Sequence, residues 1–194
     1  MLSILYSIKY LLCVLLNAFI IKLMDDYIDS SNNLFTDFIS KTKEGILPYS
    51  LLIFAIACLI NVKLSASLFL SSYIVGMYGD FNRRLTLKLK GYQESLIILL
   101  IGIFLIGLME MISSLLIIVT FQIIDDLIDY NKDKYFNCLN LAIKYGVIEV
   151  LIFACILILI TIKLNYQKLI YCSIIFSVFQ FIEKIINVEE VNWN

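Results

Sequence analysis

The amino-acid sequence predicts an all-α protein, a polytopic membrane helical bundle of about seven transmembrane helices. Of its 194 residues, 61% are hydrophobic and 16% are charged, and the mean hydropathy is +0.94. Soluble domains have roughly half apolar and a quarter charged residues. The hydrophobic excess lies in long apolar runs, which are typical of membrane-spanning helices. With one proline and seven glycines in the chain, we see no linker, and we expect residues 1–194 to form a single integral membrane domain.

The predicted spans are seven apolar segments: 3–24, 46–62, 64–79, 92–107, 109–130, 140–162 and 167–187. The first is read as a retained span and not as a signal peptide, because it lacks a small-residue cleavage site. The stretch from Ser95 to Ile124 is interrupted by a single charged residue, Glu110. As one helix it would be about 45 Å long, whereas the hydrocarbon core is about 30 Å thick. We therefore expect a break near Gly107–Glu110.

Two copies of an acidic cluster end the first and the fifth predicted spans. KLMDDYIDSS, residues 22–31, holds the first copy, and QIIDDLIDYN, residues 122–131, holds the second. The matching aspartates are 100 positions apart: Asp25, Asp26 and Asp29 recur as Asp125, Asp126 and Asp129. On a helix, side chains three or four residues apart share a face. Each cluster should therefore form a carboxylate stripe, which Asp133 extends in the second copy.

The distribution of basic residues indicates the membrane face on which the clusters lie. With a break near Gly107 both clusters end odd-numbered spans, so both lie on the same face. The loops on that face carry most of the basic residues: Lys41, Lys43, Arg83, Arg84, Lys88, Lys90, Lys132 and Lys134. The opposite loops carry Lys63, Lys163 and, on this count, Lys168. The positive-inside rule then predicts that the aspartate clusters face the cytoplasm.

Converging carboxylates near a low-dielectric boundary repel one another and are costly to desolvate, which favours a site that divalent cations occupy. Carboxylates without His or Cys select a hard cation, Mg²⁺ or Mn²⁺ before zinc. The sequence has no histidine, and its five cysteines form no CxxC motif. The expected metal ligands are Asp25, Asp26, Asp29, Asp125, Asp126, Asp129 and Asp133. Because magnesium keeps positions open for phosphate oxygens, a diphosphate is the expected substrate group.

Basic residues on the cluster side are candidates for binding diphosphate oxygens: Arg83, Arg84, Lys88, Lys90, Lys134 and Lys43. A second interpretation stays open for both residue types. Basic residues at cytoplasmic span ends are usually topology signals, and acidic residues at helix ends are commonly just solvated. The repetition of the whole cluster favours the site. The net charge of −1 gives no reason to expect a nucleic-acid partner.

These motifs resemble those of the UbiA-type intramembrane prenyltransferases over roughly residues 10 to 165. Asp126-x-x-Asp129-x-x-x-Asp133 reproduces the second aspartate motif of that family, and the following DKYFNCLNLAIKYG resembles its stretch leading to a basic residue and a glycine at the next helix. The first cluster is similar to the family's NDxxDxxxD motif, with Asp25 in place of Asn and Asn33 in place of the last Asp. KTKEGILPYS resembles a degenerate form of the loop that follows.

A rival resemblance is to the soluble trans-prenyl diphosphate synthases, whose two DDxxD motifs are similar to DDYID and to FQIIDDLIDY. Those enzymes are longer, water-soluble helical bundles, and they usually have an Arg-rich stretch after the first motif, where SSNNLFTDF stands here. The hydrophobicity of the chain favours the membrane family. Both families act on diphosphates, so the expected substrate class is the same for either resemblance.

The UbiA resemblance implies a transfer, assisted by Mg²⁺, of an isoprenyl group from a polyprenyl diphosphate to an acceptor, with Asp26, Asp29, Asp126 and Asp129 in catalytic roles. Four aromatic residues either line a tunnel for the isoprenyl tail or pack against lipid: Tyr73, Tyr78, Phe104 and Phe121. Two alternatives stay open, a terpene cyclase that needs no acceptor and a non-catalytic relative that binds divalent cations. Family members usually have nine spans, and this chain is expected to lack the first and the last, which leaves the acceptor unidentified.

Overall fold

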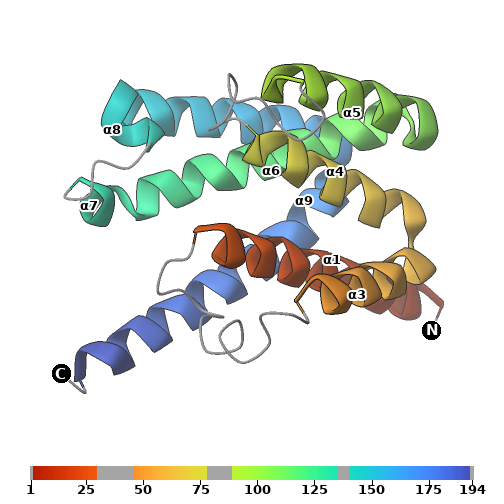
Figure 1. Ribbon diagram of the computed structural model, residues 1–194, viewed down its shortest axis with the longest axis horizontal. Coiled ribbons are helices and arrows are strands. Elements are labelled where there is room, and N and C mark those ends of the chain that lie inside the picture. Colours follow the sequence, from red (N-terminus) through yellow and green to blue (C-terminus); the bar gives the residue numbers. More distant parts are fainter. Residues whose placement is uncertain (1, 30–45, 78–88, 135–139, 193–194) are drawn as a thin grey trace. The chain divides into compact units, whose positions relative to one another are not determined.

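The computed structural model describes residues 2–29, 46–77, 89–134 and 140–192, without the side chains of 2–4, 25–29, 132, 133 and 186–192. Every regular element in these ranges is a helix (Figure 1), which confirms the all-α class. The chain divides into two compact units, one of Met1–Ser65 with Ile170–Asn194 and the other of Ala66–Leu169. We call them unit 1 and unit 2 and describe each by itself. The single membrane domain expected from the sequence stays a prediction.

Three helices of the described residues are long and apolar enough to cross a membrane. They are Leu5–Met24 within α1 (Leu2–Asp29), the whole of α6 (Leu108–Ile128), and Val147–Ile185 within α9 (Val147–Asn192). Three shorter apolar helices have 15 or 16 residues each: α3 (Ile46–Ile60), α4 (Val62–Gly76) and α5 (Gly91–Ile106). Helix length and composition therefore agree with a membrane protein, and the number of seven spans stays a prediction.

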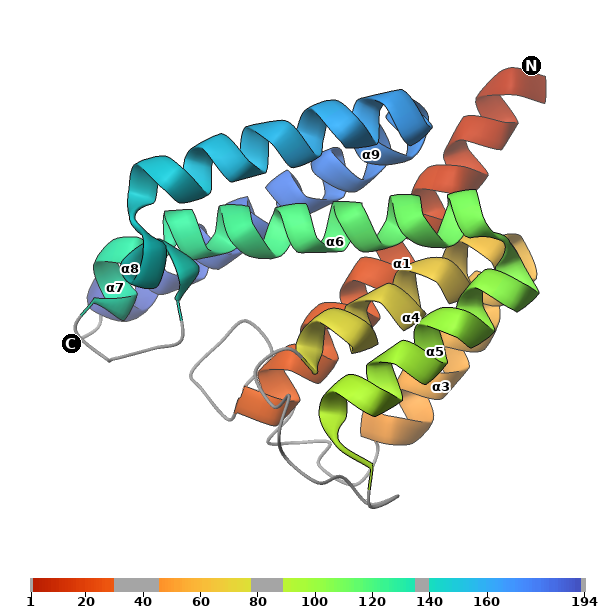
Figure 2. The same cartoon turned by 90° about the horizontal axis from the view of Figure 1, so that it is seen from above.

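The break expected near Gly107–Glu110 is confirmed at Gly107. This residue separates α5 from α6 with a φ of 114°, a backbone conformation that L side chains rarely adopt. Its N–H donates to Ile103 O and its carbonyl accepts from Met111 N, so hydrogen bonding continues across the break. The two helices form a hairpin (Figure 2), in which Gly102 of α5 is buried beside the Met111 side chain of α6.

Asparagine and glycine also mark the other interruptions. Asn61 stands between α3 and α4, and its Oδ1 accepts a hydrogen bond from Leu64 N at 3.1 Å. Asn165 has a non-helical backbone inside α9, near the gap expected between spans 140–162 and 167–187. The predicted start of the sixth span, at residue 140, is wrong. Residues 141–145 form the separate short helix α8 (Leu141–Tyr145), which ends at Gly146, where φ is 101° and α9 begins.

Unit 1 contains α1, α3, the first residues of α4 and the last part of α9. Between α1 and the start of α4, Cys13 Sγ lies 3.0 Å from Ser65 Oγ, and Asn17 Nδ2 donates to the same oxygen at 3.1 Å. One turn before Cys13 on α1, the Tyr10 ring lies 5.1 Å from the Tyr171 ring of α9. Lys22 Nζ lies 3.5 Å from Glu183 Oε2. Aromatic and polar contacts thus hold α1 to the C-terminal part of α9.

Unit 2 is built around α6 and the first part of α9. A buried core joins Ile123 of α6 to Val150, Ala154 and Leu157 of α9, and Figure 2 shows the two helices side by side. Leu141 of α8 packs against the same core. This packing places α8 beside the C-terminal end of α6, where the second acidic cluster lies.

Candidate functional site

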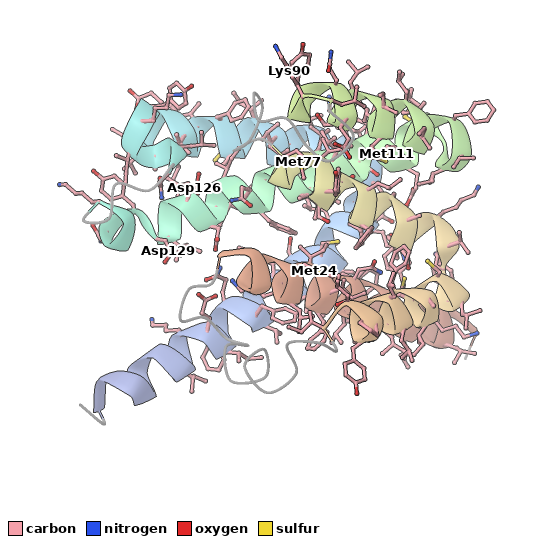
Figure 3. All side chains as sticks on the ribbon, viewed as in Figure 1. Met24, Met77, Lys90, Met111, Asp126 and Asp129 are labelled. Carbon is pink, nitrogen blue, oxygen red and sulfur yellow. The ribbon has the colours of Figure 1, made fainter. Side chains whose placement is uncertain are left out.

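The second acidic cluster lies at the C-terminal end of α6. Asp125 and Asp126 belong to the last turn of the helix, and Asp129 is the residue that follows it, with its N–H donating to Asp125 O at 2.9 Å. The side chains of all three are half-buried. Asp126 and Asp129 are labelled at this end of α6 in Figure 3.

The expected stripe of Asp126, Asp129 and Asp133 does not continue along one helix. Helix α6 ends at Ile128, and Asp133 ends a separate helix of four residues, α7 (Tyr130–Asp133). The Asp133 side chain lies outside the described part of the chain. Seven-residue spacing therefore does not by itself place Asp133 on the same face as Asp126.

Asp126 is held by the start of α8. Its carboxylate Oδ2 accepts a hydrogen bond from Leu141 N at 3.0 Å, and its backbone carbonyl accepts one from Asn140 Nδ2 at 2.7 Å. Negative charge near a helix N-terminus is favourable, because the first backbone N–H groups of a helix lack partners within it. These contacts fix both the backbone and the carboxylate of Asp126 in unit 2.

The first acidic cluster lies at a matching position, the end of α1. Asp25 and Asp26 belong to its last turns, and Asp29 is its last residue. Their side chains lie outside the described part of the structure. This cluster belongs to unit 1 and the second cluster to unit 2, so the convergence of the two stays a prediction.

Two of the six basic residues proposed for diphosphate binding can be located. Lys134 is exposed and directly follows α7. Lys90 is exposed at the start of α5, where its Nζ lies 5.8 Å from the centre of the Tyr92 ring. Figure 3 shows that Lys90 does not lie beside Asp126. The other four proposed residues lie outside the described residues: Lys43, Arg83, Arg84 and Lys88.

The described residues do not supply a complete metal site by themselves. Within the described ranges, no group of three or more acidic, histidine or cysteine side chains is arranged to hold a metal ion. Asp125, Asp126 and Asp129 offer carboxylate oxygens, which is the ligand chemistry that Mg²⁺ prefers. A complete ligand set would therefore need Asp133 or the first cluster in addition.

The aromatic residues proposed for a tunnel have different surroundings. Phe104 is 89% exposed and lines no interior surface of the described structure. Phe121 is half-buried on α6. Tyr73 is half-buried too, and its hydroxyl donates to Glu94 Oε1 at 2.8 Å, which joins α4 to α5. Tyr78 lies outside the described residues.

A buried ion pair in unit 2 was missed by the sequence interpretation, which assigned Lys168 to a loop. Lys168 is fully buried, and its Nζ donates to Glu110 Oε1 at 2.8 Å and to Ser114 Oγ at 2.6 Å. It also lies 3.2 Å from Ser67 Oγ on α4. The sequence does carry a signal for this pair, since Lys168 stands at the start of a long apolar run. Ionisable residues in such runs usually pair with another polar group.

Comparisons with known protein families, curated proteins and solved structures give no significant match to this chain. The resemblance to UbiA-type prenyltransferases therefore depends on the motifs of the sequence.

Proposed function

We propose that the protein is a Mg²⁺-dependent intramembrane prenyltransferase, which transfers an isoprenyl group from a polyprenyl diphosphate to an acceptor. The observation that carries this proposal is the position of the repeated cluster. Among the described residues, three helices are long enough to cross a membrane, and two of these, α1 and α6, end in the same aspartate pattern. The hairpin at Gly107 supports the proposal further, because a single rod through residues 95–124 would place the clusters on opposite membrane faces.

Helix stability does not explain acidic residues at these positions. The C-terminal end of a helix carries partial negative charge, so each carboxylate there costs about 0.3–1 kcal/mol when exposed. Neither α1 nor α6 has a basic residue in its last turn to offset this. The contact of Asp126 with α8 offsets the cost for one carboxylate. A repeated aspartate pattern at two helix C-termini therefore indicates a role other than helix stabilisation, and carboxylate oxygens suit the binding of hard cations.

In the proposed reaction the bond between the isoprenyl carbon and the diphosphate oxygen breaks, and the diphosphate leaves with the electron pair. The acceptor then forms a bond to that carbon and loses a proton. Bound Mg²⁺ would neutralise charge on the leaving diphosphate, with ligands drawn from Asp25, Asp26, Asp29, Asp125, Asp126, Asp129 and Asp133. Lys134, which is exposed after α7, would bind diphosphate oxygens, and the exposed apolar surface of the helices would admit the isoprenyl tail from the lipid.

The test is diphosphate release from geranyl, farnesyl or geranylgeranyl diphosphate by the full chain in lipid nanodiscs, with and without Mg²⁺. We expect Asp126→Asn and Asp26→Asn to lower the rate at least about a hundredfold, because charge stabilisation in the transition state is lost. Glu149→Gln is the matched control, since Glu149 is exposed at the start of α9, and it should retain the rate.

The outcomes also separate the alternatives. Release that persists in both aspartate variants would remove these residues from the mechanism. Hydrocarbon or terpene alcohol formed from the diphosphate alone would favour the cyclase. No release from any of the three donors would contradict both enzymes and favour the cation-binding relative.

A further inference from the structure

We propose that Asn140 is a positioning residue for Asp126, because its side chain joins the last turn of α6 to the first turn of α8. This inference deepens the proposed function and rests on it, since Asp126 is there a ligand of the metal. Sequence motifs assign no role to Asn140.

The two ends of the Asn140 amide make different contacts. Its Oδ1 accepts hydrogen bonds from Ala142 N at 2.8 Å and from Ile143 N at 3.3 Å, which caps the N-terminus of α8. Its Nδ2 donates to Asp126 O at 2.7 Å. Asn140 is 3% exposed, so water cannot easily reach the amide and replace either contact.

The next residue completes the connection. Leu141 N donates to Asp126 Oδ2 at 3.0 Å. Two consecutive residues thus hold the carbonyl and the carboxylate of Asp126 at once. Because both groups are fixed, the direction of the carboxylate is set by the position of α8 and not by Asp126 alone. Groups that orient a metal ligand in this way raise its affinity for the metal.

Capping alone does not account for an asparagine at this position. An N-cap requires an acceptor, which Ser, Thr or Asp supplies as well as Asn. The amide adds a donor, and this donor reaches a carbonyl in the last turn of α6, where backbone carbonyls lack partners within the helix. The capping role and the positioning role therefore reside in different atoms of Asn140, and substitutions can separate them.

Three variants of the full chain in lipid nanodiscs make this separation. Asn140→Ser keeps a capping oxygen but removes the amide donor, and Asn140→Ala removes both. Asn61→Ala is the matched control, because Asn61 Oδ1 likewise accepts from a backbone N–H at the start of a helix, that of Leu64 in α4. Binding of Mn²⁺, a paramagnetic probe of the Mg²⁺ site, is measured by electron paramagnetic resonance, and stability by thermal unfolding.

We expect both Asn140 variants to weaken Mn²⁺ binding roughly tenfold, the lower end of the range for residues that orient metal ligands. The concentration of Mg²⁺ that half-saturates diphosphate release should rise by a similar factor, while the rate at saturating Mg²⁺ stays close to that of the wild type. Asn61→Ala should lower the unfolding temperature, as Asn140→Ala does, but leave Mn²⁺ binding unchanged.

Wild-type affinity for Mn²⁺ in Asn140→Ser would overturn the inference. Equal weakening in Asn61→Ala and Asn140→Ala would overturn it too, since affinity would then follow general stability. Absence of Mn²⁺ binding by the wild type would refute the metal site of the proposed function, and the positioning role with it. Failure of the inference alone leaves wild-type binding intact, so the two failures are distinguishable.

Discussion

Lys168 Nζ lies 2.8 Å from Glu110 Oε1, and this ion pair joins α9 to the first turn of α6. Lys168 is fully buried, whereas the Glu110 side chain is 28% exposed. The ammonium group also donates to Ser114 Oγ and to the backbone carbonyl of Glu110. A buried cation with this many acceptors is well compensated. If the lysine were removed, each of these acceptors would lose its donor, and Glu110 would also lose its counter-charge.

Replacing Lys168 by Met should destabilise unit 2 by roughly 3–5 kcal/mol, because Glu110 and the serines lose their common donor. Equilibrium unfolding in mixed micelles measures the change. Lys163→Met is the matched control, since Lys163 is an exposed lysine on the same helix, and it should change stability little. The double variant Lys168→Met/Glu110→Gln should recover part of the loss, because no uncompensated carboxylate remains. A loss below about 1 kcal/mol in Lys168→Met, as for a surface pair, would contradict the burial of this ion pair.

Gly107→Ala should destabilise the hairpin of α5 and α6 by about 1–2 kcal/mol, because alanine is strained in the left-handed backbone region. A Cβ at Gly107 would meet no atom within 4 Å, so the cost comes from the backbone and not from a clash. Gly76→Ala is the matched control, since its Cβ would also meet nothing within 4 Å, and Gly76 lies at the end of α4 without a positive φ. Unfolding of the two variants, measured in parallel, should show a loss in Gly107→Ala alone.

The break at Gly107 could be predicted from the sequence because it follows from a length limit. An apolar stretch longer than the bilayer must break, and a glycine near its middle is the residue that tolerates the required backbone. The boundary at 140 could not be predicted in the same way. Residues 141–145 are largely apolar, and the separation of α8 depends on Gly146 and on contacts with Asp126.

The burial of Lys168 also lay beyond the sequence, because its partners are distant in the chain. Ser67 and Glu110 come from α4 and α6, and nothing in the local pattern around Lys168 identifies them. The aspartate clusters were found because they repeat, and repetition is visible without a structure. The supporting role of Asn140 was not found, since a single asparagine before an apolar segment indicates a cap and not a contact with α6.

Asp126→Ala should increase hydrogen exchange at the start of α8. The Leu141 N–H donates to the Asp126 carboxylate, and a hydrogen bond to a charged group contributes about 1.5–3 kcal/mol. The exchange rate of this amide should therefore rise roughly tenfold or more, as followed by mass spectrometry of the peptide that contains it. Asp129→Ala is the control, because Asp129 is not the acceptor of this amide. Equal exchange in both variants would mean that the carboxylate of Asp126 does not hold α8.

Tyr73→Phe should destabilise the contact between α4 and α5, because the Tyr73 hydroxyl donates to Glu94 Oε1. The other carboxylate oxygen of Glu94 is buried and has no hydrogen-bond partner within the described residues. Loss of the tyrosine donor would leave the whole carboxylate without support from α4, at a cost of about 1.5–3 kcal/mol in the free energy of unfolding.

Tyr92→Phe is the matched control for Tyr73→Phe, since Tyr92 is 40% exposed and its ring can still lie under Lys90. It should leave the free energy of unfolding nearly unchanged. The double variant Tyr73→Phe/Glu94→Leu should recover most of the loss, because removing both partners leaves no buried polar group unsatisfied. If Tyr73→Phe and Tyr92→Phe proved equally stable, the hydrogen bond would contribute nothing to the packing of α4 on α5.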